Sequence, residues 1–257
     1  MMSNKVENIV LSVVAVLAVA VVVVLYICGA RRQSGMECGG VRVNVTDSKV
    51  NKFVSEGDVK KIVSTNYGDI TGVFADSIDL VSMERLLEKK SVIRDCEAYF
   101  TRDGFLNIDI TQRTPVVRFQ NAANGWYADA DGYIFPLQRS YTSMVQVVDG
   151  DFPIDVERGF KGQIEDTGQR EWLMRVVGMA EYIRGSEWKN RISQIHVSGN
   201  GEVLLVPSEG KERFIFGQPV EIETKFGKME KYYRMILPLK KEYRQVDLRF
   251  DGQIVCR

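Results

Sequence analysis

The longest apolar run of the chain lies close to its N-terminus. Every residue from Ile9 to Ile27 is apolar except Ser12, which makes a run of 19 residues. A helix that rises 1.5 Å per residue would extend about 28 Å over this run, close to the roughly 30 Å hydrocarbon core of a bilayer. The apolar part of a cleaved signal peptide is shorter, and Ala18 and Ala20 lie too deep in the run to mark a cleavage site. We therefore expect an uncleaved helix that crosses a membrane once.

The segment after the apolar run combines the hydrophobic periods of strands and helices. Residues 41–45 alternate between valine and polar side chains, which is typical of a half-buried strand. Two amphipathic helices are predicted next, one capped by Ser55 and one beginning near Asp79. Residues 93–100 and 106–110 form two further predicted strands, and the Asp-Gly pair between them favours a hairpin. The order strand, helix, helix, strand, strand predicts a small α+β domain.

The rest of the chain is dominated by short predicted strands with turn signals between them. Two amphipathic helices interrupt the series, one from about Thr167 to Gly185 and one from Ile222 to Ile236, which Pro238 follows. Strands are predicted at 116–120, 125–128, 133–137, 145–148, 192–197, 202–206, 213–216, 245–250 and 253–256. This pattern favours a mixed β domain with flanking helices.

The predicted fold class is α+β after the single N-terminal transmembrane helix. The chain divides into a tail at 1–8, the transmembrane helix at 9–27, a linker at 28–39, a first domain at 40–115 and a β domain at 116–257. Basic residues do not settle which side of the membrane the domains occupy. Lys5 precedes the helix and Arg31 and Arg32 follow it, so the positive charges on its two sides are nearly balanced.

Composition excludes several classes of protein. The chain of 257 residues has 34 basic and 34 acidic residues, so no net charge draws it to nucleic acid. A hydrophobic content of 45% with 26% charged residues is typical of a chain that folds around a core. The four cysteines, Cys28, Cys38, Cys96 and Cys256, form no CxxC pair, which argues against a zinc ribbon or a thioredoxin-like site. Cys28 belongs to the membrane segment, and the other three are consistent with either a disulfide or free buried thiols.

Candidate catalytic and metal-binding residues are few. His196 is the single histidine and lies in a strand-like alternation, where a structural role is more common than a catalytic one. A calcium loop with Gly132 at its invariant glycine would place Tyr127 and Gln138 at positions that require carboxylates. The sequence contains no common nucleotide-binding or hydrolase motif. We therefore predict a protein that is not an enzyme and uses no cofactor, metal or small-molecule substrate.

Three segments of the sequence carry a resemblance to a known family. They are LNIDITQRTPVVRF at the end of the first domain, WYADADGYIFP in the β domain and VDLRFDGQIVCR at the C-terminus. With the N-terminal anchor and the strand-helix-helix-strand-strand unit, they make nearly the whole chain similar to the FtsQ/DivIB family of bacterial cell-division proteins. QRTPV also recurs in related transport-associated (POTRA) domains. Cys38, Cys96 and Cys256 lie outside the general family pattern and indicate a variant of the kind seen in Bacteroidetes-like bacteria.

The resemblance implies both a place in the cell and a role. It implies a cytoplasmic N-terminal tail, one helix in the inner membrane, and a POTRA-like domain and a β domain in the periplasm at the division septum. Members of the family are divisome scaffolds that link FtsB-like and FtsL-like bitopic proteins to septal peptidoglycan synthesis. In that family the partner adds a strand to the edge of the β domain near its C-terminal end. An edge strand suits this role because its unpaired N–H and C=O groups can bind an extended peptide.

The resemblance also assigns contact residues, which we carry over to the matching positions. The expected partner-binding residues are Arg249, Phe250, Gly252, Gln253, Ile254 and Val255. A second expected contact with other division proteins is the turn of Gln112, Arg113, Thr114 and Pro115. Phe250 is expected to be an apolar anchor, although core packing would explain it equally well, and Gly252 is expected to allow close approach of a partner backbone.

Two alternative functions differ in class from a division scaffold. A POTRA-type periplasmic chaperone or assembly factor usually carries several POTRA units or a barrel, and the sequence predicts neither. A membrane-anchored cell-wall enzyme would require a deep polar cleft around His196 or the carboxylates.

Overall fold

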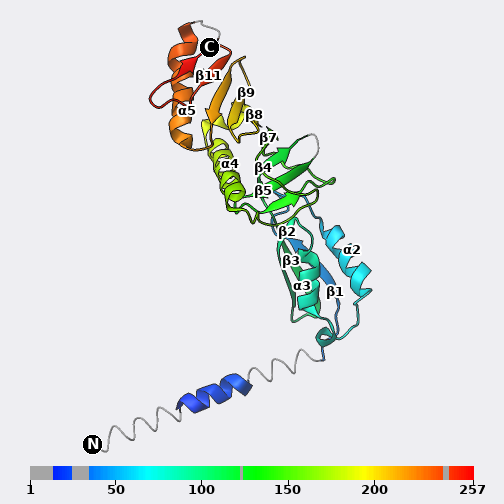
Figure 1. Ribbon diagram of the computed structural model, residues 1–257. Coiled ribbons are helices and arrows are strands. Elements are labelled where there is room, and N and C mark those ends of the chain that lie inside the picture. The colour runs from blue at the N-terminus through cyan, green and yellow to red at the C-terminus, as the bar shows by residue number, and fades with distance from the viewer. Residues whose placement is uncertain (1–13, 25–34, 122–123, 240–242) are drawn as a thin grey trace, which may run out of the picture. The chain divides into compact units, whose positions relative to one another are not determined.

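The structure is a computed structural model that describes residues 14–24, 35–121, 124–239 and 243–257. Its residues form two units (Figure 1). The N-terminal unit contains the chain up to Ser48 together with Val54–Gln112. The C-terminal unit contains Lys49–Phe53 and Arg113–Arg257.

The predicted membrane helix, 9–27, lies partly outside the described residues, as does most of the predicted linker at 28–39. The tail at 1–8 and Cys28 lie entirely outside them. Residues 14–24 are helical and exposed. Within the described ranges, no helix combines the length and the apolar character needed to span a bilayer. The membrane helix therefore stays a prediction.

The N-terminal unit has the predicted order of strands and helices. Its three-stranded sheet has the order β1-β3-β2, with β1 parallel and β2 antiparallel to β3. The elements are β1 (Gly40–Val45), α2 (Glu56–Tyr67), the 3-10 helix η1 (Ala75–Ser77), α3 (Leu80–Glu88), β2 (Ile93–Phe100) and β3 (Phe105–Gln112). The α+β class and the strand-helix-helix-strand-strand unit are thus confirmed.

Local hydrogen bonds explain where these helices begin. Ser55 and Asp58 form a reciprocal capping box at the start of α2. The Asp79 carboxylate accepts the backbone N–H of Ser82 at 3.0 Å and so caps α3. The hairpin between β2 and β3 turns at Gly104, whose φ of +82° is accessible to glycine at little cost.

The C-terminal unit is built on a nine-stranded mixed sheet. Its order is β12-β11-β10-β9-β8-β7-β4-β5-β6, and the pairs β10–β11, β4–β7 and β7–β8 are parallel. The strands are β4 (Pro115–Gln120), β5 (Gly125–Asp129), β6 (Ile134–Pro136), β7 (Gln146–Gly150), β8 (Ile192–Val197), β9 (Val203–Pro207), β10 (Arg213–Gly217), β11 (Gln245–Asp247) and β12 (Val255–Cys256). The helices are α4 (Thr167–Gly185), the 3-10 helix η2 (Glu187–Asn190), α5 (Ile222–Lys231), the π-helix η3 (Tyr232–Ile236) and the 3-10 helix η4 (Leu237–Leu239).

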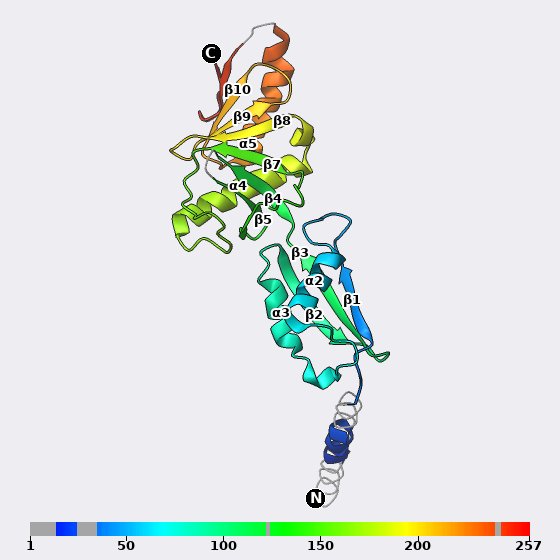
Figure 2. The same ribbon diagram turned by 90° about the vertical axis from the view of Figure 1, so that its right-hand side faces the viewer.

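The core of this unit lies between the sheet and its two long helices. Figure 2 shows α4 and α5 on one side of the strands. Leu173 and Val176 of α4, Phe226 of α5, and Phe119 and Phe214 of the sheet are at most 1% exposed and belong to one hydrophobic cluster. Because every second residue of each strand points to this side, the opposite face of the sheet carries half-buried and polar residues at β7 to β10. At β5 and β6 that face carries the buried rings of Tyr127 and Phe135, which pack against Phe53.

The C-terminal end of the chain departs from the predicted elements. The helix predicted to Ile236 is α-helical only to Lys231 and continues as η3. The strands predicted at 245–250 and 253–256 are shorter, because β11 ends at Asp247 and β12 begins at Val255. The Asp247 carboxylate accepts the backbone N–H of Arg249 at 3.1 Å. This local bond replaces a bond of the strand ladder, so the strand ends there.

Candidate functional site

β12 is the last strand of the sheet and pairs with β11 alone. Gln245 and Arg257 exchange both backbone hydrogen bonds, at 3.1 and 2.9 Å, and so form a hydrogen-bonded pair of this antiparallel ladder. In the next pair of the ladder, which contains Cys256, the N–H and C=O groups of each residue point away from the other strand. The N–H and C=O of Cys256 therefore point away from β11. By the same alternation the N–H and C=O of Ile254 also point away from β11. No strand of the described chain lies there, and we call residues 254–256 the open edge.

The other end of the sheet is closed. β6 pairs with β5 on one side, and on its other side Ile134 exchanges two backbone hydrogen bonds with Gly162, at 2.8 and 2.9 Å. Two residues further along the strand stands Pro136, which has no N–H group to offer. We call residues 134–136 the covered edge, because the outward donor of Ile134 is bonded and Pro136 has none.

Phe250 lies in the loop that leads into the open edge, outside the core. The sequence allowed two explanations for Phe250, an apolar anchor for a partner or a place in the core. It is 45% exposed, so the core-packing explanation is wrong. Its carbonyl oxygen accepts a hydrogen bond from the Lys228 ammonium at 2.7 Å. A large exposed aromatic ring in the loop that leads into an edge strand is a favourable feature for binding a peptide.

The glycine after this ring serves the turn itself. Gly252 has a φ of +64°, and the N–H of Gln253 bonds to the Phe250 carbonyl at 3.3 Å. A side chain at this backbone angle would be strained, although no atom lies within 4 Å of where its Cβ would stand. The conformation of the turn therefore accounts for this glycine without the close partner approach expected from the sequence.

Arg249 was expected to bind a partner, but its guanidinium is engaged within the unit. Nη2 pairs with Asp247 Oδ2 at 2.8 Å, and Nη1 lies 3.3 Å from Glu202 Oε2. The hydrogen bond from Arg249 is the first cause that holds the pKa of the Asp247 carboxyl below its usual range. The methylene groups of Arg249 pack over Gly217, where an added Cβ would stand 2.7 Å from Arg249 Cγ. Arg249 thus fastens the loop between β11 and β12 to β10.

Sequence reasoning missed Lys228, which supports the same loop from α5. Its side chain is 8% exposed, and its ammonium donates to the carbonyls of Leu248 and Phe250 at 3.0 and 2.7 Å. The side chains of Ile254 and Cys256 pack against the core from the strand side. No local pattern identifies such a lysine, because its acceptors are 20 and 22 residues away in the sequence.

The second expected contact, residues 112–115, is divided between the two units. In the N-terminal unit Gln112 is 1% exposed, and its Oε1 accepts the N–H of Val54 at 2.8 Å. Its Nε2 donates to Asp47 Oδ1 at 3.2 Å. The Gln112 side chain is therefore part of a buried network and is not displayed on the surface for a partner.

The three remaining residues of this expected contact belong to the C-terminal unit. Arg113 pairs with Asp129 at 2.8 Å and lies 3.4 Å over the Tyr133 ring. Pro115 is buried at the start of β4. Only Thr114 is exposed, and its hydroxyl accepts a hydrogen bond from a neighbouring amide at 2.9 Å.

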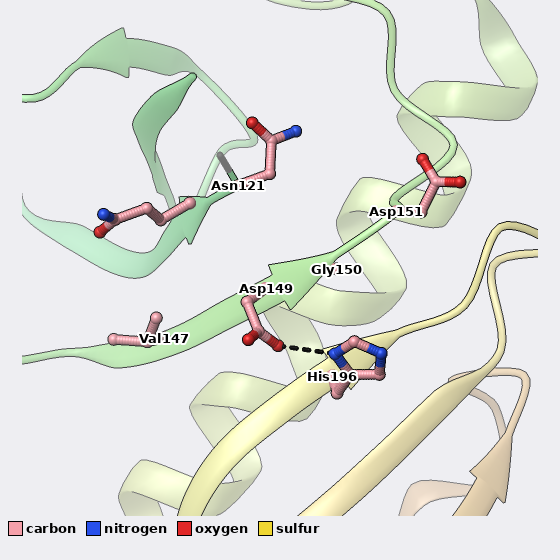
Figure 3. A pocket seen from close by; sticks show the side chains of 7 residues that line it. Asn121, Val147, Asp149, Gly150, Asp151 and His196 are labelled. Atoms are coloured by element: carbon pink, nitrogen blue, oxygen red, sulfur yellow. Dashed lines mark hydrogen bonds and ion pairs between the residues drawn. The ribbon is translucent and has the colours of Figure 1, made fainter. Parts of the chain in front are cut away.

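A polar recess lies around His196 on the face of the sheet opposite α4 and α5 (Figure 3). The Nδ1 atom of His196 is 3.0 Å from Asp149 Oδ1, and Gln194 donates to the same carboxylate. The side chains of His196 and Asp149 are 45% and 33% exposed, so the recess, of about 780 Å³, is open to solvent. It is lined by Gln120, Asn121, Val147, Asp149, Gly150, Asp151 and His196.

The chemistry of this recess is limited. The lining residues of the described chain include no Ser, Thr, Cys or Lys that the imidazole could activate as a nucleophile. A Cβ at Gly150 would overlap the Val197 carbonyl oxygen, so tight strand packing explains this glycine. The arrangement is a half-exposed His-Asp pair in a sheet and not the deep polar cleft that a cell-wall enzyme requires.

The cysteines of the described chain are free thiols. Cys38 and Cys96 are buried, and Cys256 is half-buried. Burial, the largest cause, raises the pKa of Cys96 to about 12, so its thiol stays protonated and unreactive near neutral pH. Of the two states that the sequence leaves open, the structure has the reduced one. Within the described ranges no cluster of His, Cys, Asp or Glu has the geometry to hold a metal ion.

Comparison with known families gives two matches that together cover both units. Residues 114–257 match the family model described as FtsQ/DivIB, C-terminal related, and residues 36–111 match the model of a POTRA-like domain. The first match alone covers more than half of the chain. Both families consist of non-catalytic scaffold domains, which fits a scaffold role in cell division. No curated protein matches the chain.

Proposed function

Because this chain belongs to the FtsQ/DivIB family, as its sequence segments predict, we propose that it is a scaffold of the divisome that binds a partner by strand addition. In this proposal the chain links FtsB-like and FtsL-like bitopic proteins to septal peptidoglycan synthesis. Helix 9–27 anchors it in the cytoplasmic membrane with the N-terminus inside, and both units lie in the periplasm at the septum. The chain performs no catalysis in this role.

The observation that carries the proposal is the open edge of the C-terminal sheet. The N–H and C=O of Cys256 point away from β11, and no described strand receives them. Unpaired strand edges are sites of intermolecular pairing, and proteins usually protect the edges that are not used in this way. Here the opposite end of the same sheet is protected by Gly162 and Pro136.

The side chains around the open edge suit an extended peptide with alternating apolar residues. Ile254 and Cys256 turn their side chains to the core, so only their backbone is offered to a partner strand. The exposed Phe250 ring provides an apolar contact just before the strand. Backbone bonds would give such a complex its register, and Phe250 would select apolar partner side chains.

The test is a substitution that removes an outward donor and leaves the inward ladder unchanged. Cys256→Pro removes the N–H that faces the partner, while the bonds between Gln245 and Arg257 remain possible. Cys256→Val is the matched control, because it changes the side chain and keeps the N–H. Co-purification of the full chain with its FtsB-like partner should fall at least about tenfold for Cys256→Pro and stay near wild type for Cys256→Val.

Folding of both variants is checked by their thermal unfolding. Partner capture that is equal for the two folded variants would refute strand addition at this edge. The alanine variant of Phe250 adds a side-chain readout, and we expect it to weaken capture by about tenfold without changing the unfolding temperature.

A further inference from the structure

A groove of about 450 Å³ lies next to the open edge, between α5 and the loop that leads into β12. Ile254 takes part in both features, because it lines the groove and its backbone N–H and C=O point away from β11. The volume of the groove lies within the range of about 300 to 1,000 Å³ that is usual for binding sites. A chain that pairs with the open edge would therefore run along the border of this groove.

One wall of the groove is a row of residues on a single face of α5 and η3. Thr224, Gly227, Lys231 and Arg234 follow one another at spacings of three, four and three. Gly227 has no side chain, and no atom lies within 4 Å of the point where its Cβ would stand. The same is true of Gly252 in the opposite wall. The two walls thus leave space between them for the side chains of another polypeptide.

The two cations of this row are exposed and unpaired. The side chains of Lys231 and Arg234 form no hydrogen bond or ion pair with another described residue. Lys228 also lines the groove, and its ammonium bonds to two carbonyl oxygens, which carry no net charge. The acidic residues of the lining are Glu230 and Asp251. With three cations and two carboxylates, the groove has a net positive charge.

The direction of the side chains in β12 shows which part of an added strand would reach the groove. The side chains of Ile254 and Cys256 pack against the core, which lies on the side of the sheet that α5 covers. In neighbouring strands, residues directly opposite each other project their side chains to the same face. Every second side chain of a strand paired with β12 would therefore point to the side of α5, and so toward the groove.

Given the strand addition proposed above, on which this site depends, we propose that the partner strand carries acidic side chains at the positions that point toward α5. Lys231 and Arg234 bind these side chains. An apolar side chain at such a position would take water from two unpaired cations without replacing its hydrogen bonds. A carboxylate supplies those bonds, and the planar guanidinium of Arg234 can bond both of its oxygens.

The charge of the groove also determines which strands are rejected. A lysine or arginine that points toward α5 would be repelled by the three cations of the lining. The residues between the acidic ones point to the other face of the sheet and are free to be apolar. The partner segment is therefore an alternation of acidic and apolar residues.

The test compares three capped peptides that differ only in charge. Acetyl-TVEVEVT-amide and its counterparts with glutamine or lysine in place of glutamate are titrated into the full chain. Binding is followed by the NMR shifts of the backbone amides of residues 254–256. We expect the glutamate peptide to bind about three- to tenfold more tightly than the glutamine peptide, and the lysine peptide to bind most weakly. Equal binding of the three peptides would overturn the proposal.

Two pairs of substitutions then locate the effect. Lys231→Gln combined with Arg234→Gln removes both unpaired cations and should abolish the preference for glutamate over glutamine. Arg184→Gln combined with Lys189→Gln is the matched control, because it removes two exposed cations of α4 and η2 that do not line the groove. This control should change the preference by less than about twofold, because distant exposed charges are screened. A preference that survives in the folded Lys231 and Arg234 double variant would show that the groove is not its source.

A small anion distinguishes a partner strand from a general anion site. Glutarate carries two carboxylates but has no backbone that could pair with the open edge. It should bind at least about tenfold more weakly than the glutamate peptide, because it gains no backbone hydrogen bonds. If glutarate binds as tightly as the peptide, the groove takes any anion and the assignment to a partner strand is wrong.

Cys256→Pro separates this proposal from the one on which it depends. Under strand addition, this variant weakens the binding of the glutamate and glutamine peptides alike. If it does so while the wild type binds the two peptides equally, strand addition stands and the acidic partner strand is wrong. If Cys256→Pro binds both peptides as tightly as the wild type does, strand addition itself fails, and the acidic strand fails with it.

Discussion

The two edges of the C-terminal sheet differ in whether their outward backbone N–H groups are hydrogen-bonded. At the covered edge, the outward N–H of Ile134 is bonded to Gly162, and Pro136 has no N–H. At the open edge, the outward N–H of Cys256 has no partner among the described residues. Sheet edges with free donors promote association, and the difference between the two ends is what supports the proposal that a partner strand binds at the open edge.

The open edge is nevertheless held firmly on its inner side. Lys228 bonds to the loop that leads into β12, Arg249 ties this loop to Asp247 of β11, and Ile254 packs on the core. None of these contacts occupies the outward groups of Cys256. A pre-ordered strand loses little conformational entropy when a partner pairs with it, which favours tight binding.

The largest effect on stability is expected from removing the support beneath the open edge. Lys228→Met deletes a buried ammonium that serves two carbonyl oxygens, so we expect a loss of about 2 to 4 kcal/mol in the free energy of unfolding. Urea denaturation measures it. Lys225→Met is the matched control on the same helix, because the Lys225 ammonium donates to the carbonyl of Gln218, at 2.8 Å. The comparison fails if Lys225→Met costs as much as Lys228→Met.

A smaller effect is expected from opening the covered edge. Gly162 has a φ of +139°, which an alanine adopts only at a cost of about 1 to 3 kcal/mol. Gly162→Ala should weaken the bridge to Ile134 and make the full chain associate in a concentration-dependent way, as measured by light scattering. Gly159→Ala is the control, since Gly159 also has a positive φ but takes no part in the bridge. If the two variants associate equally, Gly162 does not protect this edge.

The smallest effect is a dependence on pH at the open edge. Hydrogen bonds from Arg249 lower the pKa of Asp247 in the folded state. A carboxyl with a lowered folded pKa stabilises the fold above its unfolded pKa of about 3.9, and this contribution is lost as the pH falls through the folded value. Wild type should therefore lose stability below about pH 4 more steeply than Asp247→Asn, in thermal unfolding followed between pH 2 and 6. Parallel curves would show that this pair does not stabilise the edge.

Sequence reasoning succeeded where the deciding interaction is local. The Ser55–Asp58 capping box, the Asp79 cap and the turn at Gly104 each involve residues within four positions of one another, and all were predicted. Gln112 shows a signal that was available and not used. It continues the alternation of Leu106, Ile108 and Ile110 along β3, so its burial follows from the period of the strand.

Features that depend on long-range pairing could not be predicted from the pattern alone. β10 and β11 pair in parallel although 27 residues separate Gly217 from Gln245 in the sequence, and this pairing makes β12 the last strand. Lys228 meets its acceptors only after the chain has returned to α5. The position of the proposed partner site came from the family resemblance, whereas the open and covered edges of the sheet became visible only in its strand order.

The exchange of single backbone amide protons tests the central claim most directly. Hydrogen–deuterium exchange of the full chain is measured by NMR with and without its FtsB-like partner. Strand addition predicts that the Cys256 amide, which has no acceptor in the described structure, becomes protected at least about tenfold, while the bonded Ile134 amide does not change. An unchanged rate at Cys256 in the saturated complex would contradict the account.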